Sequence, residues 1–436
     1  MINLRQFETN AEYEAYVESE ELVVPNVSQI LEDHKVKYLR TIPPTPTGYT
    51  NQYFTFEVLT PGNIYWCSVA MQLDNSNDTI QYSKNGGEWT DITGSMTGTP
   101  ISVVEGDVVR FKNTTDKGYM AQSEDGMYVN VFGSDYNPEG ETGCTFNVYG
   151  NIMSLICGDN FEDETTMPAD VMFGYLFASD VLSMLGGPTI YCGLVSAENL
   201  ILPSTTLTYG CYSAMFAKCP ILTTAPTLPA TTLADGCYYN MFAECRRLTS
   251  APALPATTLV NQCYTGMFEG CISLITAPEL PATNLADNCY QGMFYGCTGL
   301  STALALPATT LADSCYYRMF YGCTSLTMAP ALPATTLVNQ CYYGMFNDCT
   351  NLTTAPALPA TTLAESCYES MFQGCTSLNY IKCLATDISA YSCTSNWVNG
   401  VASTGTFVKD SGMSSWTTGT SGIPTNWTVQ DYSPVN

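Results

Sequence analysis

The sequence is poor in positive charge and in histidine. Its 436 residues include 14 Lys and Arg against 40 Asp and Glu, which gives a formal net charge of −26. Because nucleic-acid binding depends on clustered Lys and Arg that contact phosphates, this balance argues against a nucleic-acid partner. His34 is the single histidine, so Ser-His-Asp or Cys-His catalysis and His-based metal sites are not expected. The sequence therefore predicts no catalytic residues, no cofactor and no metal site.

Long apolar runs are also missing. The stretch 171–185 is interrupted by Gly174, Ser179 and Asp180, and so falls short of the roughly 18 to 20 apolar residues that span a bilayer. Residues 1–16 carry Arg and Glu side chains and lack the apolar core of a secretory signal. We therefore expect no membrane insertion and a chain that is soluble where it is made.

A repeat of 26 residues occupies much of the second half of the chain. A Met-Phe pair, a Leu-Pro pair and two cysteines eight residues apart all recur at this interval without an insertion. The Met-Phe pairs begin at residues 215, 241, 267, 293, 319, 345 and 371. A unit this short cannot bury its own apolar face, so stacked copies are needed to build a continuous core.

One unit, residues 222–247, changes its character along its length. Its first half is rich in Thr and Pro, which suits a short strand and a turn. Cys237, Met241 and Cys245 then follow at spacings of four, which would place them on one face of a helix. The sequence thus predicts an α/β repeat solenoid with one short strand and one short helix in each unit.

Stacking would turn equivalent positions into buried columns about 4.8 Å apart. The zinc-type Cys-x2-4-Cys spacing is absent from these repeats, and two cysteines of one helix would lie about 12 Å apart, too far for a disulfide. We therefore expect buried free thiols, with bridges between adjacent units as the alternative. The expected core columns are represented by Leu222, Leu248, Leu274, Met241, Phe242, Cys237 and Cys245.

The motifs Leu-Pro-Ala-Thr-Thr-Leu, Cys-Tyr-x-x-Met-Phe-x-x-Cys and Leu-Thr-x-Ala-Pro make residues 195–380 resemble the BspA-like leucine-rich repeats. This family is found on surface proteins of Bacteroides-type bacteria and on virion proteins of the phages that infect them. The flanking sequences look similar to the caps of such arrays. The resemblance implies an N-terminal cap at 151–206, the leucine-rich repeat solenoid at 207–380 and a C-terminal cap at 381–436.

Residues 44–150 lack the repeat and alternate between short apolar stretches and turns. The expected strands form an all-β, Ig-like sandwich that precedes the solenoid. They cover residues 53–59, 63–71, 80–83, 101–103, 108–112, 128–132 and 144–148. Trp66 and Trp89 are candidates for stacking on a sugar ring, although a tryptophan in a sandwich more often belongs to the core.

Residues 1–43 form the most charged segment of the chain. They look similar to the N-termini of virion-attached proteins in Bacteroides-infecting phages. Because the segment buries little apolar surface by itself, we assign it to anchoring against other virion proteins. The candidate anchoring residues are Phe7, Tyr13, Tyr16, Pro25 and Asn26.

These features favour a phage virion protein of structural or adhesive type, such as a capsid-attached fibre, a decoration protein or a tail fibre. It would sit on the virion surface and display its repeats to glycans or proteins of the host surface or mucosa. Only 12% of the residues are charged, which suits contacts with carbohydrate or neutral protein better than ionic contacts. Besides Trp66 and Trp89, the candidate ligand-binding residues are Tyr239, Tyr317 and Tyr343.

Two other functions stay open. One is a BspA-like adhesin on a bacterial cell surface, and the other is a glycan-acting enzyme that uses paired carboxylates, although no such pair stands out. A homo-oligomer also stays open as a possibility, although no heptad or collagen-like stretch supports a trimeric fibre.

Overall fold

A computed structural model describes residues 49–70, 79–114, 128–184, 186–414 and 416–432. All of these residues belong to one compact unit that begins at Tyr49. The expected anchoring residues Phe7, Tyr13, Tyr16, Pro25 and Asn26 lie outside the described residues.

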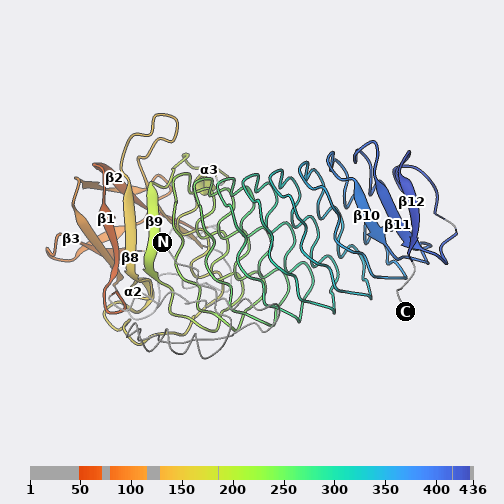
Figure 1. The fold of residues 1–436 in the computed structure, drawn as a ribbon. Coiled ribbons are helices and arrows are strands. Elements are labelled where there is room, and N and C mark those ends of the chain that lie inside the picture. Colours follow the sequence, from red (N-terminus) through yellow and green to blue (C-terminus); the bar gives the residue numbers. More distant parts are fainter. Residues whose placement is uncertain (1–48, 71–78, 115–127, 185, 415, 433–436) are drawn as a thin grey trace, which may run out of the picture. The chain divides into compact units, whose positions relative to one another are not determined.

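The first part of the unit is a β-sandwich-like region made of two sheets (Figure 1). One sheet has the strand order β4-β3-β6-β1-β8-β9 and the other has the order β5-β2-β7. Each strand expected from the sequence overlaps an observed one, whereas β4 was missed because its residues are mostly polar. The strands are β1 (Phe54–Val58), β2 (Gly62–Ala70), β3 (Thr79–Lys84), β4 (Thr90–Thr93), β5 (Thr99–Val103), β6 (Val108–Asn113), β7 (Tyr128–Ser134), β8 (Phe146–Asn151) and β9 (Leu194–Ile201).

Aromatic rings fill the space between these two sheets. The ring centroids of Phe56 in β1 and Phe111 in β6 lie 5.1 and 4.8 Å from that of Phe132 in β7. Trp66 of β2 is fully buried, and its ring lies 4.7 Å from the same phenylalanine. Since the contacts of Phe56 and Phe111 with Phe132 join strands of different sheets, these rings form the core of the sandwich-like region.

The sandwich-like region continues directly into the repeats. Strand β8 pairs in parallel with β9, which precedes the first full repeat. The ring of Phe177 lies 6.2 Å from that of Phe132 and stacks on Phe216 of the repeats at 5.4 Å. The two regions therefore share one sheet and one hydrophobic core.

The second half of each repeat is a ribbon of consecutive turns, and the expected helix is not formed. Alternate N–H groups close turns within the unit: Tyr239 N donates to Gly236 O and Ala243 N to Asn240 O. The N–H groups between them bind the next unit, as when Tyr238 N donates to Cys263 O. In an α-helix, all of these N–H groups would donate to carbonyl oxygens of the same helix. Sharing them with the neighbour ties successive repeats together along the array.

The turn ribbon requires a left-handed residue at every fourth position. The φ angles of Gly236, Asn240 and Glu244 are 60°, 53° and 58°. The same three positions have positive φ in the repeats that follow, for example at Asn288, Gly292 and Gly296. A spacing of four is close to the helical period, and this similarity explains why the sequence favoured a helix. The described residues contain two helices, α2 (Ser154–Cys157) and α3 (Val181–Met184), and neither lies in a full repeat.

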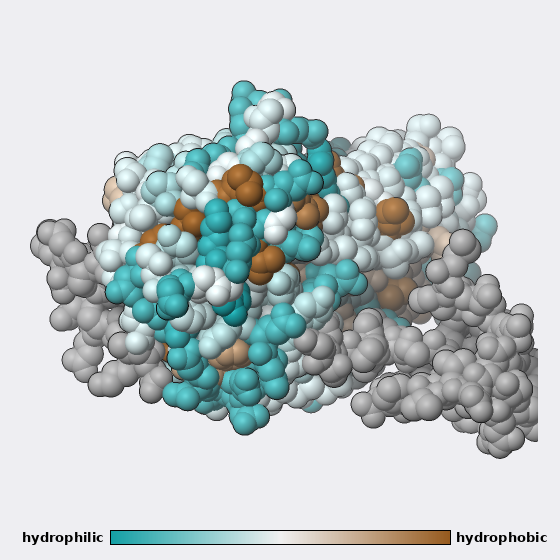
Figure 2. Space-filling view, turned by 90° about the vertical axis from the view of Figure 1, so that its left-hand side faces the viewer, coloured by the Kyte–Doolittle hydropathy of each residue, from teal (hydrophilic) through white to brown (hydrophobic). Residues whose placement is uncertain are grey.

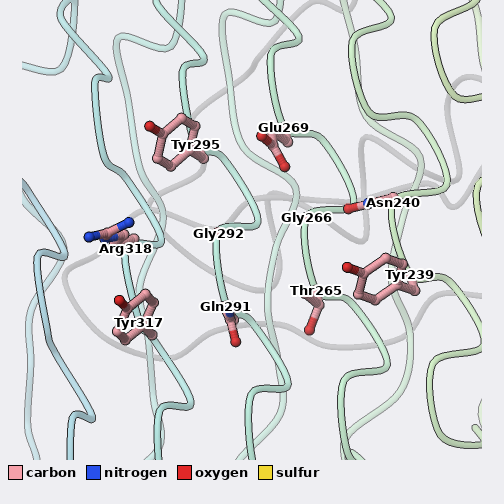
Figure 3. Close-up of a pocket in the computed structure, with 10 residues that line it drawn as sticks. All are labelled: Tyr239, Asn240, Thr265, Gly266, Glu269, Gln291, Gly292, Tyr295, Tyr317 and Arg318. Carbon is pink, nitrogen blue, oxygen red and sulfur yellow. The ribbon is translucent and has the colours of Figure 1, made fainter.

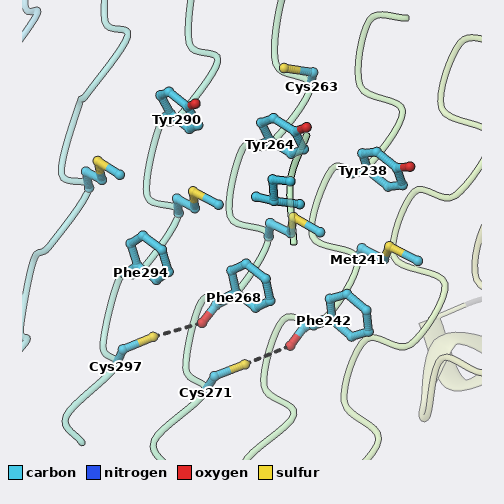
Figure 4. Packing of buried hydrophobic residues seen from close by; sticks show 14 of the residues in the cluster. Tyr238, Met241, Phe242, Cys263, Tyr264, Phe268, Cys271, Tyr290, Phe294 and Cys297 are labelled. Atoms are coloured by element: carbon cyan, nitrogen blue, oxygen red, sulfur yellow. Dashed lines mark hydrogen bonds between the residues drawn. The ribbon is translucent and has the colours of Figure 1, made fainter. Parts of the chain in front are cut away.

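Two of every four ribbon residues point inward and build the core of the array (Figure 4). The Tyr column stacks ring on ring, as between Tyr238 and Tyr264 at 5.8 Å, and so does the Phe column, as between Phe242 and Phe268 at 5.7 Å. All seven expected core-column residues are fully buried: Leu222, Leu248, Leu274, Met241, Phe242, Cys237 and Cys245.

The Thr-rich half of each repeat forms isolated bridges to its neighbours, such as Thr206 with Thr232 and Thr276 with Thr302. Proline residues lack N–H donors, which keeps these bridges from extending into long ladders. At the C-terminal end a parallel three-stranded sheet completes the unit. Its strands are β10 (Tyr380–Cys383), β11 (Thr406–Asp410) and β12 (Thr428–Tyr432).

Within the described residues, no helix has the length and the apolar character that crossing a bilayer requires.

Candidate functional site

The outward face of the turn ribbon carries the side chains that differ from repeat to repeat. In the second repeat these are Tyr239, Asn240 and Glu244, which are exposed or partly exposed, whereas their inward neighbours are buried. Outward side chains are free to vary because they take no part in the common core. This face is therefore where the repeats acquire individual chemistry.

A hollow of about 180 Å³ lies on this face where two successive repeats have glycine at the second left-handed position. We call it the glycine hollow, after Gly266 and Gly292. A Cβ atom on Gly292 would meet only Tyr295 Cβ, at 3.9 Å, so the space above this residue is open. The repeats on either side carry Asn240 and Arg318 at the same position, and these two side chains bound the hollow.

Polar and aromatic side chains form the walls of the glycine hollow (Figure 3). Tyr295 and Glu269 line one side, and Tyr239, Gln291 and Tyr317 line the other. The lining also includes Thr265, whose hydroxyl donates to Asn288 O at 2.6 Å. Aromatic ring faces beside groups that can form hydrogen bonds suit a ligand that has both apolar and polar surfaces.

Two charged groups lie at opposite ends of the hollow. Glu269 is partly buried, and this burial, together with the nearby Glu244 carboxylate, raises the pKa of Glu269. A Cβ on Gly266 would lie 3.4 Å from Glu269 Oε2, which places this carboxylate at the Gly266 end. Arg318 lies two repeats further along, which corresponds to roughly 10 Å at the usual strand spacing.

Tyrosine rings surround the guanidinium group of Arg318. Its Cζ lies 5.2 Å from the ring centroid of Tyr317, 5.8 Å from that of Tyr321 and 5.5 Å from that of Tyr343. These rings also stack along the array: Tyr317 on Tyr343 at 4.7 Å, and Tyr295 on Tyr321 at 4.6 Å. The rings therefore hold the guanidinium in place through cation–π contacts.

All three tyrosines that were expected to bind ligand lie on this face. Tyr239 and Tyr317 both line the glycine hollow, and Tyr343 lies in the repeat after Arg318. Sequence reasoning missed Arg318 and Glu269, because their outward direction depends on the turn ribbon and not on a helix. The available signal was the change of residue type, from glycine to arginine, at one position of an otherwise regular repeat.

The structure separates the two tryptophans that were candidates for stacking on a sugar ring. Trp66 has no exposed surface, so it is a core residue and offers no face to a ligand, which corrects its assignment. Trp89 is partly exposed, but Lys112 Nζ lies 4.6 Å from its ring centroid and is held there by Asp159. One side of the Trp89 indole is thereby occupied.

The surface at the sandwich end offers less to a ligand. Its described residues show small, separate apolar patches among hydrophilic ones (Figure 2). Isolated exposed apolar side chains are normal on a soluble surface and do not by themselves mark a binding site. As for metals, the described part of the chain contains no group of three or more His, Cys, Asp or Glu that could hold an ion.

The stacked units, the uniform core and the varied outward face define a repeat solenoid. Residues 212–353 and 290–396 match a family model described as the BspA type leucine rich repeat region, with six copies. The repeats of this chain are therefore BspA-type leucine-rich repeats. This family is a binding scaffold and typically not enzymatic, and its members are usually surface-displayed or extracellular, so the match indicates an adhesion or protein-binding role. Searches of curated proteins and of solved structures found no match.

Proposed function

We propose that this chain is an adhesion protein of a phage virion, and that the outward face of its turn ribbon contacts glycans or proteins of the host surface or mucosa. The observation that supports the adhesion role is the difference between the inward and the outward positions of each repeat. Inward positions such as Cys237 and Met241 keep the same residue in every full repeat, while the outward positions next to them change.

A constant core with varied outward side chains suits recognition of an extended ligand. Each repeat adds a row of outward side chains about 4.8 Å from the last, so the array presents a regular lattice of contacts. Many weak contacts along such a lattice add up through multivalency, without a deep pocket. The abundant Thr, Asn and Tyr side chains can bind hydroxyl groups and stack on sugar rings.

The virion part of the proposal rests on the resemblance of residues 1–43 to the N-termini of virion-attached proteins. In this arrangement the N-terminal segment attaches to other virion proteins, and the repeats point toward the host. A bacterial surface adhesin would use the same repeats on a cell envelope, so location separates the two functions.

Gold-labelled antibody against the chain, viewed by electron microscopy in a culture that contains particles and cells, tests the location. We expect gold on the particles. Gold on the envelopes of uninfected cells would instead assign the chain to the bacterial surface. Removal of residues 1–43, which leaves the whole described unit intact, should abolish incorporation into particles. Normal incorporation of this truncated chain would refute the anchoring role.

A further inference from the structure

Arg318 differs from the two other arginines of the array. Arg246 and Arg247 each lie next to a glutamate, whereas Arg318 has no carboxylate within ion-pair distance among the described residues. Its Nε atom is buried and has no hydrogen-bond partner in this part of the chain. In a protein with 40 acidic residues, an arginine held by aromatic rings and left without an anion calls for an explanation.

A guanidinium group has five N–H donors in a planar fork that matches a carboxylate. Cation–π contacts with Tyr317, Tyr321 and Tyr343 fix the position of this fork without using its donors. The group is therefore preorganised for an external anion. Arg318 lines the glycine hollow, and its side chain extends over Gly344 of the next repeat, where a Cβ atom would lie 3.8 Å from Arg318 Nε.

The remaining walls of the glycine hollow narrow the class of ligand. Tyr295 and Tyr317 present aromatic rings on its two sides, and Gln291 and Asn240 contribute amide groups. Glu269, at the end away from Arg318, can accept hydrogen bonds from hydroxyl groups. A ligand that fits has a carboxylate at one end, hydroxyl groups at the other and a ring between them.

We propose that the glycine hollow binds a carboxylated sugar of a glycan, with the sugar carboxylate on Arg318 and its ring against the tyrosines. Sugar hydroxyl groups donate to Glu269 at the opposite end. This inference rests on the proposed adhesion function and adds to it a site and a ligand class. A uronic acid and a sialic acid share the required chemistry.

Binding of the full chain to defined oligosaccharides, measured by calorimetry, tests the site. The probes are tetragalacturonate for uronic acids and sialyllactose for sialic acids, with the methyl ester of tetragalacturonate and lactose as their uncharged counterparts. We expect one or both acidic probes to bind at least about tenfold more tightly than the uncharged counterpart, because the ester and the neutral sugar cannot form the charged pair.

Two variants with matched controls locate the site. Arg318→Gln should weaken binding of the acidic probe by about tenfold or more, whereas Lys218→Gln removes the same charge from another left-handed position and should have little effect. Gly292→Asn should block the hollow while preserving the fold, since Asn240 occupies the same position with φ of 53°. Ser370→Asn makes a similar change outside the hollow, at φ of 55°, and should bind like the unaltered chain.

Each outcome is decisive. Failure of both acidic probes to bind, or equal binding by the Arg318→Gln variant, overturns the proposed site. If that variant and the unaltered chain also adhere equally to host cells, adhesion stands and only the site fails. If the unaltered chain adheres to no cell or mucosal surface, the proposed function itself fails, whatever the oligosaccharides do.

Discussion

The Sγ atom of Cys271 donates a hydrogen bond to the carbonyl oxygen of Phe242 in the preceding repeat, at 3.1 Å. The second cysteine of each full repeat makes the same bond to a phenylalanine in the preceding unit, which for Cys219 is Phe177 of the region before the repeats; the distances are 2.9 to 3.2 Å. A thiolate or a disulfide could not donate this bond. The cysteine column therefore works as a ladder of protonated thiols between repeats.

The ladder predicts the reactivity of the thiols. Burial raises the pKa of Cys271 well above its ordinary value and that of Cys297 to about 12, so at about pH 8 these groups are neutral as well as inaccessible. We expect the native protein to react slowly with a thiol reagent, beginning at the partly exposed Cys157. After denaturation without a reductant, all 20 cysteines should react.

Replacement of Cys157 by Ser provides the control, because it should remove the early phase and leave the slow one. Fewer reactive thiols in the denatured protein would reveal disulfides. Rapid reaction of many thiols in the native protein would show that the ladder opens readily.

Replacing a glycine at a left-handed position should lower the stability of the protein through backbone conformation alone. Gly322 has φ of 70°, and a Cβ atom there would meet Gly296 Cα at an ordinary contact distance of 3.7 Å. Gly322→Ala should therefore lower the free energy of unfolding by about 1–2 kcal/mol through strain and without a clash. Gly322→Asn should cost less, because asparagine tolerates this conformation. Denaturant unfolding measures both variants, and equal stability of the alanine variant would contradict the left-handed assignment.

The sequence predicted the period of the array and its inward residues, because burial forces the same residue to recur at the same place in every unit. It did not predict the conformation that links those residues. Residues 237, 241 and 245 fit both a helix and a ribbon of turns, since both return to one face after about four residues. The overlooked signal was Asn288, Gly292 and Gly296, which are weak helix formers that also repeat every four residues.

The binding face depends on this difference. In a helix, the outward direction of Arg318 and its distance from Glu269 would be set by a rotation of 100° per residue. In the ribbon, pairs of residues alternate between inside and outside, so these two side chains and Tyr317 share one surface. The parallel pairing of β8 with β9 was likewise invisible in the sequence, because it joins two segments that have unrelated patterns.

Phe177 joins the core of the sandwich-like region to that of the repeats, which predicts coupled unfolding. Its ring contacts Phe132 on one side and stacks on Phe216 on the other. Phe177→Ala should cost about 3–5 kcal/mol, the usual range for removal of a buried phenylalanine. Hydrogen exchange should become faster in β7 and in the first repeats together.

Phe346→Ala serves as the matched control for Phe177, since Phe346 is equally buried but lies far along the array. Its effect should be confined to the nearby repeats, because each unit mainly contacts its neighbours. If Phe177→Ala left exchange in β7 unchanged, the two regions would be independent despite their shared sheet.

Glu269 predicts a pH-dependent contribution to stability at the glycine hollow. Burial and the nearby Glu244 raise its pKa, so the folded state binds the proton more tightly than the unfolded state does. The charged form therefore costs stability above this pKa, and the protein gains stability as the pH falls through it. Glu269→Gln should raise the Tm at neutral pH by a small amount, on the order of 1 °C, and this difference should disappear in acid, where Glu269 is protonated.

Glu198→Gln removes one charge from an exposed position on β9 and separates this local effect from a general reduction of net charge. A Tm difference that stayed constant from neutral to acidic pH would show that the Glu269 carboxylate is as well solvated in the folded chain as in the unfolded one.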